Sequence, residues 1–500
     1  MRRTHALTEE KGLGLKGWLS GPRKKQHEIE TRPEKIVSSD KHRVAVLPFA
    51  NISPDTADEY FADGMTEELI DRLSQVGELR VIARTSVMSY KRIAKKISEI
   101  GKELGVGTLV EGSVRKAGNK IRVTVQLIDA STEEHIWSSR YDKNLADIFE
   151  VQGDIASRIT ASLAGALVAQ KTPRITEKDT ENITAYSCFL QGRHLLNEDT
   201  EDSILEGLKM LEKAVTLDPS FARAHAYIAS GYIQLEFKGH LTREESMKNA
   251  KLAAQKALDL NENLAEVHAV LSEIAWIEDD FGRDELEAKR AIELNPNLAY
   301  AYERLATVKM TNGYPNEGLR LYESAYLLDP LSPRNMKGLG IMYLYRGKYK
   351  EADELLTKCL EIAPKDALYG ITMGHLIRGK FDRAEETIRS LESTFPEDIW
   401  TTALRGYLEA LRGNRQKAEQ IIKTLYDNYG ASVGPNQLSG FIRYFLGDDD
   451  AFFAAMFRGV ENHALSPLVL RYSPLLERAR RDSRYRDLMI KDGLDPDLKE

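Results

Sequence analysis

The chain has 500 residues, more than one hydrophobic core usually serves, so two or more folding units are expected. Hydrophobic residues make up 42% and charged residues 29% of the sequence, which excludes the disordered and collagen-like classes. The net charge of −7 provides no positive field to attract phosphate backbones, so nucleic acid is not an expected partner.

Cysteine usage and hydropathy constrain the compartment and the cofactors. Cys188 and Cys359 lie far apart without a neighbouring His or Cys at metal-ligand spacing, so neither a disulfide nor a zinc site is predicted. Residues 1–26 are polar and do not match a secretory signal, and no apolar run approaches the ~20 residues that a membrane-spanning helix needs. We expect a soluble cytoplasmic protein that binds no cofactor and no metal ion.

Residues 1–41 are predicted to be a flexible polar tail, because they show no hydrophobic periodicity. The tail contains one match to the dinucleotide-binding motif GxGxxG, from Gly12 to Gly17. This motif requires a preceding strand and a surrounding βαβ unit, and neither is indicated here. The match is therefore discounted.

Residues 42–168 are predicted to form an α/β domain with a mixed sheet and flanking helices. Expected strands at 44–47 and 79–83 alternate with an amphipathic helix over 59–76 and a helix over 97–104. Asp63 is a candidate cap of the first helix, with Glu67 and Glu68 near the positive end of its dipole. Apolar residues then alternate with polar ones, which predicts a hairpin. The remaining elements are hairpin strands at 109–115 and 121–127, a strand at 135–140 and a helix over 148–159.

This segment resembles the TolB-amino-terminal-like (FlgO-related) domain of prokaryotic signalling proteins. Matching motifs follow one order along nearly the whole domain, at Val46 to Phe49, Tyr60 to Leu69, Glu111 to Arg115, Gln126 to Ala130, and Trp137. The resemblance implies a domain that sits between an N-terminal effector and a C-terminal array of repeats. The effector is commonly a class III nucleotide cyclase, a protein kinase or a winged-helix DNA-binding domain.

Beyond a polar linker at 169–182, the sequence repeats itself. Pro296, Pro330 and Pro364 are spaced by 34 residues, and small and bulky residues recur in phase with them. This period is typical of the tetratricopeptide (TPR) helical hairpin. The resemblance to TPR proteins covers 183–432 and predicts about seven hairpins in an all-α superhelical solenoid, one of them enlarged near 237–242. Residues 433–500 are predicted to be a degenerate repeat and C-terminal cap.

Catalytic signatures are absent from the sequence. It contains no HExxH, GxSxG, GxxxxGK[ST], CxxC or protein-kinase motif. Asp63, Glu67 and Glu68 could be metal ligands, but helix capping and the helix dipole explain them without a metal. The arginines from Arg478 to Arg486 alternate with acidic residues, which favours a solvated helix face over an anion site. We expect no catalytic activity.

A candidate peptide groove follows from the TPR pattern. By resemblance to TPR proteins, the second, fifth, ninth and twelfth positions of each first helix line the concave face. The apolar members predict a continuous row of Ile233, Trp276, Met310 and Leu344. The flanking polar and aromatic candidates are Arg223, Glu266, Glu273, Tyr300, Glu303, Arg334 and Lys337. The alternative is that the apolar row packs against the adjacent helix as core.

Three functions are compatible with this organisation. The leading hypothesis is a non-catalytic scaffold or regulatory component of prokaryotic signal transduction. Its TPR groove would bind a protein partner, for example a separately encoded signalling effector. The second is a class III adenylate or guanylate cyclase-family protein that lacks, or is split from, its catalytic domain, since 41 residues before the α/β domain are too few for one. The third, a transcriptional regulator, requires a winged helix that the sequence does not show.

Overall fold

The structure is a computed structural model, and it describes residues 40–165, 168, 178–238, 240–430, 433–462 and 467–498. Nearly all of the predicted tail and residues 169–177 of the predicted linker lie outside the described residues. Among the described residues, no helix is long and apolar enough to cross a membrane.

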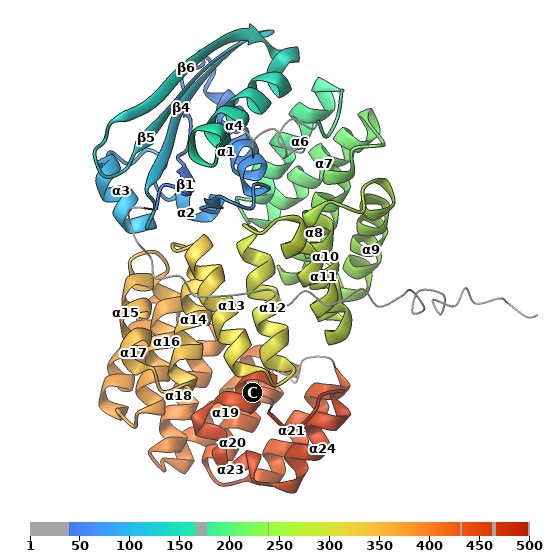
Figure 1. The fold of residues 1–500 in the computed structure, drawn as a ribbon. Coiled ribbons are helices and arrows are strands. Elements are labelled where there is room, and N and C mark those ends of the chain that lie inside the picture. The colour runs from blue at the N-terminus through green and yellow to red at the C-terminus, as the bar shows by residue number, and fades with distance from the viewer. Residues whose placement is uncertain are drawn as a thin grey trace, which may run out of the picture. The chain divides into compact units, whose positions relative to one another are not determined.

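The N-terminal part is an α/β domain built on one mixed sheet (Figure 1). Its strands are β1 (Arg43–Val46), β2 (Ala50–Asn51), β3 (Arg80–Val81), β4 (Thr108–Ala117), β5 (Lys120–Asp129) and β6 (His135–Asn144). Their order is β3-β1-β4-β5-β6, with β2 beside β4. β1 runs parallel to β3 and β4, whereas β4, β5 and β6 are antiparallel neighbours. The predicted hairpin is therefore present, and it is longer than expected.

The helices of this domain are α1 (Glu59–Ser74), α2 (Arg84–Met88), α3 (Ile97–Leu104) and α4 (Ile148–Leu163). α1 and α4 lie side by side against the sheet (Figure 1). Every residue of β1 is buried, which fits the continuous apolar run of Val44, Ala45 and Val46. Gly105 ends α3 in the left-handed conformation at φ 65°, as expected for a helix that stops at glycine. The short α2 was not predicted.

Asp63 does not cap α1, contrary to the prediction. The helix already begins at Glu59, because the 3₁₀ turn Thr56–Asp58 starts it upstream. Asp63 is therefore buried inside the helix, where its carboxylate accepts hydrogen bonds of 2.7 and 2.8 Å from Lys91 Nζ. Its second neighbour is His194 Nδ1 at 3.1 Å.

Seven helical hairpins follow between residues 183 and 429 of the described chain (Figure 1). They are α6 (Ile183–Leu196) with α7 (Glu201–Leu217), α8 (Ala222–Phe237) with α9 (Arg243–Leu260), α10 (Ala265–Ile277) with α11 (Phe281–Leu294), α12 (Ala299–Thr311) with α13 (Pro315–Leu328), α14 (Pro333–Tyr345) with α15 (Tyr349–Leu360), α16 (Pro364–Ile377) with α17 (Phe381–Thr394), and α18 (Ile399–Leu411) with α19 (Arg415–Tyr429). The enlarged repeat is the second one, since α8 and α9 have 16 and 18 residues whereas α10 and α11 have 13 and 14.

Pro364 does not occupy the same structural position as Pro330. Pro330 lies in the turn between α13 and α14, whereas Pro364 is the first residue of α16. α15 has only 12 residues, so the following helix begins early. Proline is accepted there because the first turn of a helix has no partner for its N–H in any case. The 34-residue spacing is thus preserved in sequence but not in helix boundaries.

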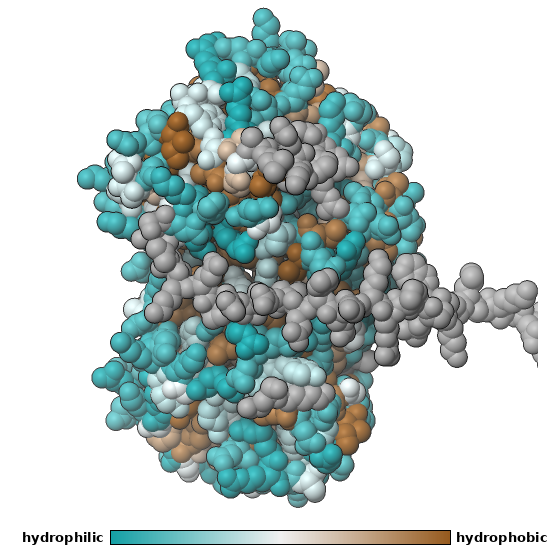
Figure 2. Space-filling view, viewed as in Figure 1, coloured by the Kyte–Doolittle hydropathy of each residue, from teal (hydrophilic) through white to brown (hydrophobic). Residues whose placement is uncertain are grey.

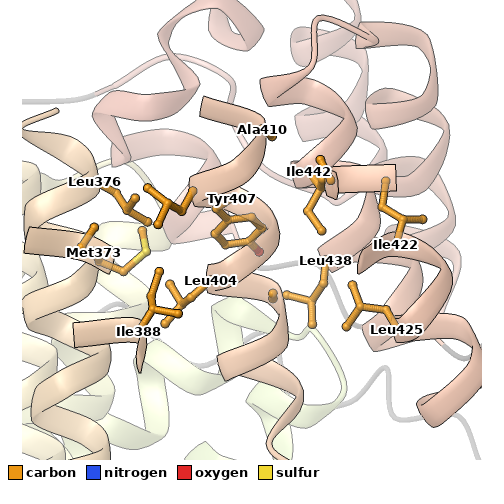
Figure 3. Packing of buried hydrophobic residues seen from close by; sticks show 14 of the residues in the cluster. Met373, Leu376, Ile388, Leu404, Tyr407, Ala410, Ile422, Leu425, Leu438 and Ile442 are labelled. Carbon is orange, nitrogen blue, oxygen red and sulfur yellow. The ribbon is translucent and has the colours of Figure 1, made fainter. Parts of the chain in front are cut away.

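Apolar packing joins successive hairpins. Figure 3 shows Tyr407 of α18 between Met373 and Leu376 of α16 on one side and Leu438 and Ile442 on the other. Gly406 permits this close approach, because a Cβ there would lie 2.4 Å from Ile442 Cδ1. A continuous core of this kind is what stabilises a solenoid, whose repeats contact mainly their neighbours.

The C-terminal segment returns to the middle of the array. α20 (Val433–Phe445) and α21 (Asp449–Glu461) form an eighth hairpin, followed by α22 (Pro467–Tyr472), α23 (Glu477–Arg480) and α24 (Ser483–Lys491). The Tyr472 hydroxyl donates a 2.8 Å hydrogen bond to the Met310 carbonyl at the end of α12. The predicted cap thus contacts an earlier repeat as well as the last hairpin.

Candidate functional site

The predicted apolar row is mostly core. Ile233, Met310 and Leu344 are fully buried. Met310 lies against Gly318 of α13, and Leu344 packs on Ala352 and Leu356 of α15. These three side chains cannot contact a peptide in this structure, which corrects the predicted row. The physical reason is that the twelfth position lies at the end of the first helix, where the second helix of the same hairpin closes over it.

Trp276 and its neighbours form a polar and aromatic cluster in the middle repeats. The Trp276 ring is partly buried, 4.7 Å from the Arg304 guanidinium and 5.7 Å from the Phe281 ring. Arg334 lies 5.1 Å over the Tyr300 ring and pairs with Glu303 at 2.9 Å. The predicted residues Tyr300, Glu303 and Arg334 are therefore brought together, with Arg334 in contact with both of the others.

Arg223 belongs to a different site, a junction between the α/β domain and the first repeats. It pairs with Glu68 of α1, with Asp71 at 3.2 Å and with Asp179 at 2.6 Å. Arg193 of α6 lies beside it and pairs with Glu67 at 2.7 Å and with Asp71 at 3.0 Å. Glu67 and Glu68, which were weighed as helix-dipole or metal-ligand residues, are thus ion-pair partners of the repeats.

Aromatic packing supports this ionic junction. The guanidinium groups of Arg193 and Arg223 each lie 5.1 Å from the centre of the Phe189 ring. Such cation–π contacts are stronger when the groups are desolvated, and both arginines are buried. Gly64 of α1 allows the helices to approach, since a Cβ there would lie 2.8 Å from Leu190 Cδ1.

The pKa values at the junction differ between neighbouring carboxyl groups. Burial alone would raise the pKa of Glu68, but the guanidinium groups of Arg223 and Arg193 hold it below its usual value. For Asp71 burial dominates and raises the pKa to about 7, although the same two arginines oppose it. Burial also raises the pKa of Asp179. Burial and the arginines therefore act in opposite directions on each of these carboxyl groups, with different outcomes for Glu68 and Asp71.

A second set of contacts extends the junction to later repeats. The Asn297 amide donates to the carbonyls of Ser74 and Leu79 at 2.9 and 3.1 Å and accepts from the Val81 N–H at 3.0 Å. Ser86 hydrogen-bonds through its N–H and its hydroxyl to the Asp329 carboxylate at 3.0 and 2.5 Å. The α/β domain is thus held at several successive hairpins.

Candidate surfaces for other molecules lie in the C-terminal repeats. On the face drawn in Figure 2, the described residues show hydrophobic side chains only as small separate patches. Two adjoining cavities of about 240 and 330 Å³ lie between the first helices of the later repeats, and both are lined by Tyr369 and Trp400. Trp400 is 49% exposed and meets the Tyr369 ring edge-on at 5.9 Å. Lys337 and Lys365 border the smaller cavity, paired with Asp366 and Asp398.

The sequence prediction did not include these aromatic residues, although the same choice of helix positions, applied to later repeats, would have included them. Trp400 and Tyr407 are the second and ninth residues of α18. Gly434, Gln437 and Phe441, at the second, fifth and ninth positions of α20, line the larger cavity as well. The predicted stripe was followed only as far as α14, and further along its second position in α18 is the exposed Trp400, whereas Ala403 and Tyr407 at the fifth and ninth positions are buried.

Comparisons with known proteins agree with this organisation at a coarse level. A family model described as the second domain of HilA/YgeH-like transcriptional regulators matches residues 39–158. A protein of Rhizobium meliloti (strain 1021), provisionally named adenylate cyclase 3, is 35% identical over 242 residues, which is 47% of this chain and 41% of that protein. The transcriptional regulator HilA of Salmonella typhimurium is 22% identical over 334 residues, or 66% of this chain and 52% of HilA. The chain thus spans about half the length of these relatives.

Solved structures of low identity match the repeats. Pseudomonas aeruginosa PilF is 17% identical with a TM-score of 0.35, and the match covers 44% of this chain and 95% of that protein. A tetratricopeptide repeat protein from Parabacteroides merdae is 15% identical with a TM-score of 0.31, and the match covers 59% of this chain and 98% of that protein. The structure thus shows an N-terminal α/β domain followed by stacked helical hairpins, and the chain is similar over part of its length to HilA-like regulators and to the cyclase-named protein.

Proposed function

We propose that this chain is a non-catalytic regulatory component of signal transduction whose TPR array binds a protein partner. The observation that carries the proposal is the half-exposed Trp400 at the cavity of the C-terminal repeats. Arg223 and Asn297 of earlier repeats already bind the α/β domain, whereas Trp400 has one aromatic neighbour and an open side. The resemblance of residues 42–168 to TolB-amino-terminal-like domains supports the signalling role.

The composition of this cleft resembles that of a binding hot spot. Interface energy concentrates in aromatic anchors, Trp above all, surrounded by polar groups that exclude water. The paired residues Lys337 with Asp366 and Lys365 with Asp398 form such a border. A partner segment with a bulky apolar residue next to polar ones would match this surface.

The test is partner capture by the tagged full-length chain, followed by quantitative mass spectrometry. Trp400→Ala is expected to weaken partner binding about 30-fold, the equivalent of ~2 kcal/mol. Leu286→Ala is the matched control, since Leu286 on α11 is 66% exposed but lines neither cavity. Equal capture by the wild type and by Trp400→Ala would contradict the proposal.

The second candidate is a regulatory part of a class III cyclase-family protein that works with a separately encoded catalytic domain, the split form. The 35% identity to the cyclase-named protein of Rhizobium meliloti favours it. The two candidates agree that this chain itself turns over no nucleotide, because a cyclase needs a cluster of metal-binding carboxylates and the described residues contain none. Purified protein with ATP or GTP and Mg²⁺ or Mn²⁺ is expected to form no cyclic nucleotide. Turnover that co-purifies with the chain through several columns would overturn that expectation, whereas a captured cyclase would favour the split form.

A further inference from the structure

The larger cavity of the C-terminal repeats differs from a peptide groove. It has a volume of about 330 Å³ and is enclosed by the first helices α14, α16, α18 and α20 and by the returning C-terminal segment. Val469 and Ser473 of that segment form part of its wall. The volume lies at the lower end of the range for small-molecule sites. Because helices line one side and the C-terminal segment lines the other, the cavity is a pocket and not an open groove.

Its lining contains no charged side chain. The wall consists of apolar and aromatic residues together with a few neutral polar groups, including the hydroxyls of Tyr345, Tyr369 and Tyr407. A buried ion without a counter-charge is strongly disfavoured. An occupant of this cavity is therefore expected to be uncharged.

Two tyrosine hydroxyls in the wall lack a partner. Tyr369 and Tyr407 both line the cavity, and no hydrogen bond joins either hydroxyl to another described residue. Burial raises the pKa of Tyr369 to about 12, so this phenol is neutral and able to donate. A hydroxyl in the cavity wall without a protein partner is available to hydrogen-bond to a polar group of a bound molecule.

We propose that this cavity binds a small uncharged molecule with an aromatic or aliphatic body and one polar group that meets the hydroxyls of Tyr369 and Tyr407. The apolar wall supplies most of the affinity and the hydroxyls orient the ligand. Because Val469 and Ser473 form part of the wall, the bound molecule also stabilises the packing of the C-terminal segment on the repeats. The cavity shares Tyr369 and Trp400 with the surface proposed for the protein partner, but a small molecule can occupy it without that partner.

The experiment uses the full chain and three size-matched probes, benzyl alcohol, benzoate and benzylamine, with binding followed by ligand-observed NMR and calorimetry. Benzyl alcohol is expected to bind at least about tenfold more tightly than either ion at pH 7. Tyr407→Phe removes only the hydroxyl and is expected to weaken benzyl alcohol binding about five- to tenfold. Tyr429→Phe is the matched control, since the Tyr429 hydroxyl donates to the Glu397 carbonyl outside the cavity.

A cavity-filling variant keeps the test independent of the hydroxyl. Val469→Phe is expected to abolish binding of benzyl alcohol while helical circular dichroism is retained. The proposal is overturned if benzyl alcohol does not bind, if benzoate or benzylamine binds equally well, or if Val469→Phe binds like the wild type. Probe binding without partner capture would contradict only the proposed protein interaction.

Discussion

Arg193 shows how one side chain can join two structural units. It is almost completely buried, pairs with three acidic residues of α1 and lies over the Phe189 ring. Breaking a buried ion pair by removing one partner is far more costly than breaking a surface pair, because the remaining charge stays buried.

Arg193→Ala is therefore expected to lower the free energy of unfolding by about 3 kcal/mol or more, because it leaves Glu67 and Glu68 with less compensation. Urea unfolding followed by circular dichroism measures the change. Arg290→Ala is the matched control, since Arg290 pairs with Glu293 at the surface and should cost less than about 1 kcal/mol. Equal losses in the two variants would show that the junction ion pairs contribute little.

Asp71 makes the stability of the junction depend on pH. Its pKa is raised from 3.8 to about 7, so the folded chain keeps a proton that the unfolded chain has released. Stability therefore falls as the pH rises from about 4 to 7. Asp71→Asn removes this titration, and its stability relative to the wild type should improve by roughly 1–3 kcal/mol between pH 5 and pH 8. The effect is excluded if the free energies of unfolding of the wild type and of Asp71→Asn change equally with pH across this range. Asp382→Asn is the control, because Asp382 is exposed.

At the scale of the helix, one position in the repeat can serve different purposes. The twelfth residue of the first helix is core in α8, α12 and α14, whereas in α10 it is the partly buried Trp276. The second residue of α8, Arg223, pairs with the α/β domain, whereas the second residue of α18, Trp400, is exposed.

Trp276→Ala tests this distinction. Because the ring packs against Phe281 and the Arg304 guanidinium, its loss is expected to cost about 2–4 kcal/mol and to lower the melting temperature clearly. Trp400→Ala should cost less than about 1 kcal/mol, because that ring is half exposed. Thermal unfolding of both variants measures the two losses of stability. If Trp276→Ala has the melting temperature of the wild type, Trp276 is not part of the core and is again a candidate groove residue.

For the whole molecule, the question is whether the repeats need the α/β domain. Solenoid repeats contact mainly their neighbours, so the fragment 172–500 is expected to fold on its own. Phe189 and Leu190 are buried, and Leu190 packs against α1, so the fragment should have a lower melting temperature than the full chain. Circular dichroism of the purified fragment checks this. A fragment without helical signal would mean that the first repeats fold only against α1.

Much of the architecture could be predicted because local patterns carry it. The alternation of Ile121, Val123 and Val125 predicts the hairpin, and Gly105 predicts the end of α3. The recurring proline and small residues predict the helical hairpins. These features depend on backbone preference and on periodic burial, which are properties of short segments.

The functional surfaces depended on contacts between segments distant in the sequence. The sequence determined that Glu68 and Arg223 would each lie on a helix, but only the tertiary structure paired them and thereby removed Arg223 from the predicted groove. The tertiary structure likewise buries Met310 in the core and leaves Trp400 exposed. The physical reason is that periodicity indicates which face of a helix is apolar, whereas only packing between helices decides which part of that face is covered.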